Sequence, residues 1–110
     1  MKDRRVFLQH LAECVARIRE YTAEGSDAFL SDHKTQDAVI RNLEILGQIV
    51  RDIGPEILAA QRPEGPWIRN AGARNLLAHQ YLGVDLSLVW NIVERDLGTL
   101  EAAVTGLLRE

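Results

Sequence analysis

The segment from Ser31 to Ile53 constrains the fold more than any other part of this 110-residue chain. Its polar residues recur at helical spacing and form one narrow stripe, made up of Asp37, Arg41, Glu44, Gln48 and Arg51. Apolar side chains fill most of the remaining circumference, among them Val39, Leu43, Leu46, Ile49, Val50 and Ile53. A helix that is apolar over so wide an arc must contact neighbours on more than one side. We therefore expect this helix to lie centrally, or at a subunit interface.

The other segments are also predicted to be helical, because their apolar residues recur at three- and four-residue steps. Their expected bounds are about 3–24, 26–30, 55–62, 67–79 and 85 onward. Breaks fall at Gly25, at Gly54-Pro55 and at 62–66, which holds two prolines and a glycine. Alternating strand patterns are absent from the sequence. The chain is therefore predicted to be all-α, an antiparallel up-and-down bundle of four to five helices that forms a single domain over residues 1–110.

Composition limits the classes of protein that the chain can represent. With 46% apolar and 26% charged residues it is an ordinary globular protein and not a disordered one. The single cysteine, Cys14, cannot form an internal disulfide, and we expect a cytoplasmic protein. No apolar run approaches the ~20 residues of a membrane span, so no membrane association is expected. Because the net charge is −3, any contact with RNA needs a local basic patch.

The candidate catalytic residues lie in one short run, Arg74-Asn75-Leu76-Leu77-Ala78-His79, and Tyr81 lies two positions after His79. Arginine keeps its charge at physiological pH, and its planar guanidinium suits phosphate oxygens. Histidine, with an unperturbed pKa near ~6.5, can accept and return a proton near neutrality. Together they supply what cleavage of a phosphodiester without a metal needs, a cation for the phosphate and a group that moves a proton. Metal ligands at zinc spacing and a glycine-rich phosphate loop are missing from the sequence, so neither metal nor cofactor is expected.

Helical geometry alone does not bring the two candidate catalytic residues together. Arg74 and His79 are five positions apart, roughly 7.5 Å along a helix axis and about 140° around it. Either the helix unwinds near Gln80 and the long arginine reaches across, or a twofold dimer places two copies of each residue in one cleft. Asn75 lies four positions before His79 and can orient its imidazole. We also expect Arg62 and Arg69 to add local positive charge.

Simpler interpretations compete for each of these residues. An Arg–His pair on a helix is more often solvated or part of a helix cap than catalytic. Tyr81 is equally explained as a core residue with its hydroxyl at the surface. Asn42, on the apolar side of its helix, is most simply a structural polar group, although a supporting role beside the cleft is open. The stripe that contains Arg41 and Glu44 is most simply a solvated, salt-bridged face.

The chain also resembles a known family over nearly its whole length. The matching blocks are 35–47, Trp67-Ile68, the run 73–81, Gly83-Val84-Asp85 and Val89-Trp90. In order and spacing they resemble the HepT-like toxins of the HEPN superfamily. The resemblance implies a dimeric helical bundle in which the two motifs face each other across a cleft.

The resemblance further implies a metal-independent endoribonuclease that acts as the toxin of a bacterial toxin–antitoxin pair. Its expected catalytic residues are Arg74 and His79, supported by Asn75. Its expected partners are an RNA substrate and a cognate minimal nucleotidyltransferase, which neutralises the toxin by adenylylating the motif tyrosine, here Tyr81. The alternative is a non-catalytic helical subunit that binds nucleotide or docks onto a nucleotidyltransferase. A purely structural helical scaffold explains the core pattern but not the motif.

Overall fold

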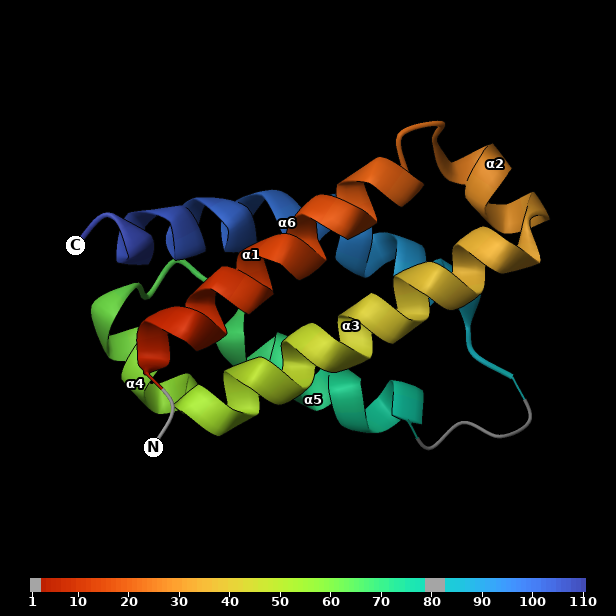
Figure 1. Ribbon diagram of the computed structural model, residues 1–110. Coiled ribbons are helices and arrows are strands. Elements are labelled where there is room, and N and C mark those ends of the chain that lie inside the picture. The colour runs from red at the N-terminus through yellow and green to blue at the C-terminus, as the bar shows by residue number, and fades with distance from the viewer. Residues whose placement is uncertain (1–2, 79–82) are drawn as a thin grey trace.

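The computed structural model describes residues 3–78 and 83–110, and in these ranges the chain is helical without a strand. The helices are α1 (Arg4–Tyr21), α2 (Ser26–Ser31), α3 (His33–Ile53), α4 (Pro55–Gln61), α5 (Trp67–Ala78) and α6 (Leu86–Leu108) (Figure 1). The predicted all-α class is confirmed. The described ranges hold six helices, more than the four to five expected, because both short segments complete a helix.

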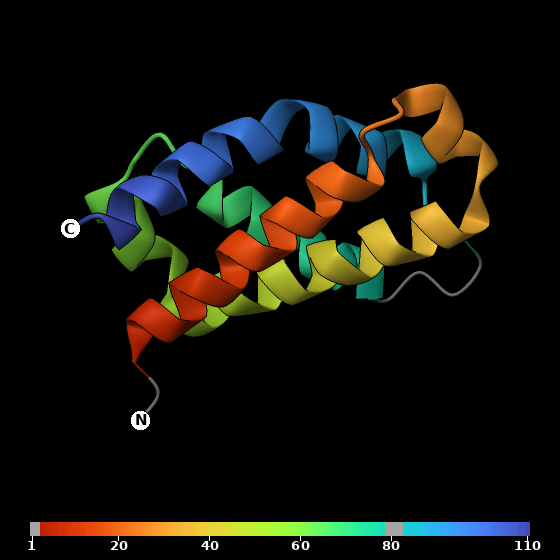
Figure 2. The same ribbon diagram turned by 45° about the horizontal axis from the view of Figure 1, so that its top comes forward.

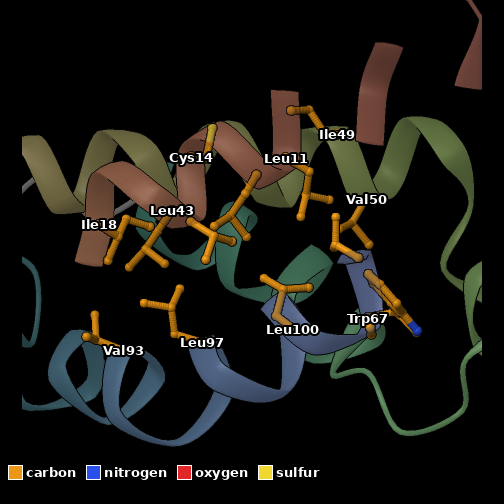
Figure 3. Packing of buried hydrophobic residues seen from close by; sticks show 14 of the residues in the cluster. Leu11, Cys14, Ile18, Leu43, Ile49, Val50, Trp67, Val93, Leu97 and Leu100 are labelled. Carbon is orange, nitrogen blue, oxygen red and sulfur yellow. The ribbon is translucent and has the colours of Figure 1, made fainter. Parts of the chain in front are cut away.

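The four long helices α1, α3, α5 and α6 alternate in direction, as Figures 1 and 2 show, so the bundle runs up and down. Helix α3 packs extensively against both α1 and α5, and it also contacts α2 and α4. Its wide apolar arc is therefore covered from several sides, which confirms the predicted central position. Figure 3 shows the core, in which Leu43 of α3 lies near Ile18 of α1 and Leu97 of α6.

The starts of α3 and α6 follow from side chains that satisfy the first backbone N–H groups. Asp32 accepts a hydrogen bond from the Lys34 amide at 3.1 Å, and Asp85 accepts from the amides of Ser87 and Leu88 at 3.0 and 3.3 Å. Between α3 and α4 the backbone needs a positive φ of 114°, which Gly54 adopts without a steric penalty. These local features set both ends of α3 and the start of α6.

The start of α5 is fixed by the indole of Trp67. This side chain is 1% exposed, and its Nε1 donates a hydrogen bond to the Arg62 carbonyl at 2.8 Å. The Trp67 ring also lies over Gly65, where an added Cβ would come within 2.4 Å of it. The connection between α4 and α5 is therefore packed tightly onto the helix that carries the motif.

In the described part of the chain, none of the helices combines the length and the apolar character needed to cross a membrane.

Candidate functional site

The candidate site is built around Arg74, which α5 places against the polar stripe of α3. Arg74 is half-buried, and it lines a surface hollow of about 200 Å³ together with four residues of α3: Arg41, Glu44, Ile45 and Gln48. These four recur at steps of three and four residues, so they share one face of α3. The hollow therefore combines two cations, a carboxylate, an amide and an apolar side chain at one point.

Helices α3 and α5 lie in close contact at Gly47, because this position carries no side chain. A Cβ built on Gly47 would lie 2.5 Å from the Arg74 Cβ and 2.7 Å from the Asn70 carbonyl oxygen. The backbone of α5 thus rests directly on α3 at the motif arginine. On α5 itself, by contrast, a Cβ on Gly72 would meet nothing within 4 Å among the described residues.

Asn42 is buried, at 7% exposure, as its place on the apolar side of α3 predicted. Its Nδ2 donates to the Ala38 carbonyl at 2.9 Å, while its Oδ1 is buried without a hydrogen-bond partner among the described residues. Asn42 lies five positions before Gly47, about 140° around the helix from the side that meets α5. Its supporting role at the site stays a prediction.

Two of the predicted site residues, His79 and Tyr81, lie outside the described residues. Asn75 follows Arg74 within α5. The structure therefore places one catalytic candidate, Arg74, and the meeting of Arg74 with His79 stays a prediction.

The neighbouring arginines Arg69 and Arg62, which were expected to add positive charge at the motif, pair with carboxylates instead. Arg69 Nη2 donates to Asp96 Oδ1 of α6 at 2.7 Å, and this hydrogen bond and charge raise the pKa of Arg69. The guanidinium of Arg62 lies on α6 at Gly106, beside Glu64 at 3.9 Å and Glu110 at 3.6 Å. The expectation that Arg62 adds charge at the motif was therefore wrong. Nothing in the sequence indicated that this side chain folds back onto the end of α6.

Across the ranges 3–78 and 83–110, histidine, cysteine and acidic residues form no cluster of three that could hold a metal ion. The histidines His10 and His33 lie on α1 and α3, and His10 is within 3.8 Å of Glu13. Independence from metals stays a prediction that a chelator tests.

The fold and the site define the class of an all-helical bundle that holds a motif arginine at its α3–α5 contact. Comparison with protein families narrows this class. The family model described as ribonuclease HepT-like matches residues 11–106, so the chain belongs to the HepT-like ribonuclease family. The predicted family is confirmed.

Curated relatives agree with this assignment. A protein of Thermococcus cleftensis named as a ribonuclease HepT is 41% identical over 96 residues, which cover 86% of this chain and 86% of that protein. A protein of Methanocaldococcus jannaschii named as an RNase is 40% identical over 93 residues, which cover 84% of this chain and 76% of that protein.

Another protein of Methanocaldococcus jannaschii, named as a gamma-glutamylcyclotransferase and RNase, is 34% identical over 110 residues, or 99% of this chain. The match covers 49% of that relative, so this chain spans about half of its length. No solved structure matches the chain.

Proposed function

We propose that this chain is a metal-independent endoribonuclease whose catalytic residues are Arg74 and His79. Three observations support the proposal. The chain belongs to a family described as ribonucleases, its sequence holds the complete Arg-x4-His run, and its fold holds Arg74 at a polar surface hollow instead of in the core. The last observation carries the proposal, because a guanidinium at such a hollow is accessible to a phosphate.

The reaction follows from the chemistry of the two groups. The 2′-hydroxyl of the RNA attacks the adjacent phosphorus, and the bond to the departing 5′-oxygen breaks, which leaves a cyclic phosphate and a 5′-hydroxyl. His79 removes the proton from the 2′-hydroxyl or protonates the departing oxygen. Arg74 holds the phosphate and offsets the charge that develops on its equatorial oxygens. Asn75 orients the imidazole, and Asn42 supports the cleft.

The active form is proposed to be a homodimer that joins through the outer face of α5. Ile68 on this face is 70% exposed, and Gly72, one turn later, has open space around it in the described part of the chain. A large exposed apolar residue beside a glycine allows a second helix to approach closely. Light scattering should give twice the chain mass for the wild type and a single-chain mass for Ile68→Lys. A wild-type monomer that cleaves RNA would contradict the dimer.

The biological role is proposed to be that of a toxin in the cytoplasm, held in check by a cognate nucleotidyltransferase that adenylylates Tyr81. Incubation with that partner and ATP should add the mass of AMP to the wild type, while Tyr81→Phe stays unmodified. Equal labelling of this variant would place the acceptor on another residue.

The competing proposal is a non-catalytic subunit that binds nucleotide or docks onto a nucleotidyltransferase. A cleavage assay separates the two, with purified protein and a structured RNA in the presence and absence of EDTA. The nuclease proposal expects cleavage that EDTA leaves unchanged. Cleavage that EDTA abolishes, or no cleavage of any RNA, contradicts it and favours the subunit.

A further inference from the structure

The hollow beside Arg74 carries more recognition chemistry than phosphate binding requires. A guanidinium is sufficient for a phosphate, yet α3 adds the carboxylate of Glu44, the amide of Gln48 and the side chain of Ile45. With a volume of about 200 Å³, the hollow is smaller than a typical small-molecule pocket of ~300–1,000 Å³. Its size suits a single ring system, such as one base of a nucleic acid.

We propose that this hollow binds a guanine base next to the phosphate held by Arg74, so that Glu44 and Arg41 give the nuclease a preference for guanine. The inference rests on the proposed cleavage of RNA, because Arg74 is shared between the phosphate and the hollow. In single-stranded RNA the Watson–Crick edge of a base is free to be read by side chains.

Glu44 is the residue that selects guanine among the four bases. Its side chain lines the hollow and is 24% exposed, so the carboxylate is only partly hydrated and can be reached by a ligand. An ionised carboxylate offers two acceptor oxygens and no donor. Guanine alone presents two adjacent donors, N1–H and the N2 amino group, on this edge. Adenine, cytosine and uracil each place a ring nitrogen or carbonyl lone pair against one carboxylate oxygen.

The remaining groups fit the rest of the guanine ring. Arg41, 71% exposed and 3.6 Å from Glu44, can donate to the O6 acceptor. The Gln48 amide nitrogen donates to Asp52 at 2.8 Å, which leaves its carbonyl oxygen to accept from the second N2 hydrogen. Ile45 offers an apolar surface to the face of the ring. The Arg41–Glu44 ion pair is open to solvent on its Arg41 side and contributes little to stability, so a base can replace it at small cost.

Binding of mononucleotides tests the hollow independently of catalysis. Backbone amide resonances of ¹⁵N-labelled protein are followed during titration with guanosine, inosine and adenosine 5′-monophosphate. We expect the guanine nucleotide to shift resonances of residues 41–48 and to bind on the order of tenfold more tightly than the adenine nucleotide. Inosine, which lacks the N2 amino group, should be intermediate.

The variant Glu44→Gln, which replaces one acceptor oxygen by a donor, should remove this difference between the nucleotides. Glu13→Gln on α1 makes the same change of charge away from the hollow and should keep it. Circular dichroism verifies that both variants fold. Equal affinities for the two nucleotides in the wild type, no binding of either, or a preference that persists in Glu44→Gln would each overturn the inference.

Cleavage mapping separates this inference from the proposed function. On oligonucleotides that carry guanine at one position in turn, the wild type should cut beside guanine, and Glu44→Gln should lose that preference. If guanine nucleotide binds at the hollow but Arg74→Ala still cleaves RNA, the proposed catalysis fails and the base site stands. If cleavage requires Arg74 but ignores guanine, the base site fails and the catalysis stands.

Discussion

The contact between Gly47 and the backbone of α5 predicts an unusual response to a mild substitution. Gly→Ala in a helix interior ordinarily stabilises the helix by about 1 kcal/mol. At position 47 the new Cβ would lie 2.5 Å from the Arg74 Cβ and 2.7 Å from the Asn70 carbonyl oxygen. Carbon atoms in contact settle at ~3.5–4.0 Å, so α5 must retreat by about 1 Å. Both obstructing atoms belong to or adjoin the backbone, and neither can rotate away.

The expected magnitude follows from two opposed terms. Overpacking of this kind costs about 1–3 kcal/mol, and the rigid backbone places this case at the upper end. After subtraction of the helix-propensity gain of about 1 kcal/mol, Gly47→Ala should lower the free energy of unfolding by about 2 kcal/mol. The matched control is Gly72→Ala on α5, where the added Cβ would meet no atom of the described residues within 4 Å. This variant should raise the free energy of unfolding by about 1 kcal/mol.

Urea unfolding followed by far-ultraviolet circular dichroism measures both variants, at one protein concentration because a dimer would make stability concentration-dependent. RNA cleavage is measured in parallel. A displacement of about 1 Å at Arg74 should reduce the rate on the order of 100-fold in Gly47→Ala, while the protein stays folded. If Gly47→Ala is as stable as Gly72→Ala, the close helix contact does not exist and the reasoning is refuted.

Three further predictions concern stability. Arg69→Ala should destabilise the fold more than Asp96→Asn. Arg69→Ala leaves the Asp96 carboxylate, 9% exposed, without its cation, whereas Asp96→Asn leaves an exposed guanidinium without its carboxylate. Urea unfolding that ranks the two variants in the reverse order would contradict this. Burial raises the pKa of the Cys14 thiol, so the unfolded chain loses the thiol proton at a lower pH than the folded chain does. The free energy of unfolding should therefore fall as pH rises through the ordinary thiol pKa, and it should fall less in Cys14→Ala. Trp67→Phe removes the Nε1 donor to the Arg62 carbonyl and should cost about 1–3 kcal/mol, and unchanged stability would show that this hydrogen bond is dispensable.

The elements of the fold were predictable because their signals are local. The N-caps Asp32 and Asp85 lie at or within one residue of the predicted helix starts, and Gly54 ends α3 at the predicted break. The wide apolar arc of α3 also predicted its central position, since an arc needs neighbours whichever helices supply them. Helix periodicity and capping are properties of a few consecutive residues, so they can be found without knowledge of the tertiary structure.

The sequence predicted which residues form the candidate site, but it did not predict what surrounds them. The Arg-x4-His spacing made Arg74 a candidate, yet no local pattern shows that Gly47 lies beneath it. The partner of Arg69 is Asp96, 27 positions away, and the carboxylates beside Arg62 include that of Glu110. Contacts between distant positions depend on which helices pair and at what register, and that information is distributed over the whole core. The polar stripe of α3 was visible as a stripe, but its position beside Arg74 was not.

The central claim is that Arg74 and His79 together break the RNA backbone. Its most direct test is the single-turnover rate of RNA cleavage in EDTA for the wild type, Arg74→Ala and His79→Ala, each verified to be folded by circular dichroism. We expect either substitution to reduce the rate by ~100-fold or more, because each removes a group to which the proposed mechanism gives a role at the reacting atoms. A rate within a few fold of wild type in both folded variants would contradict the claim.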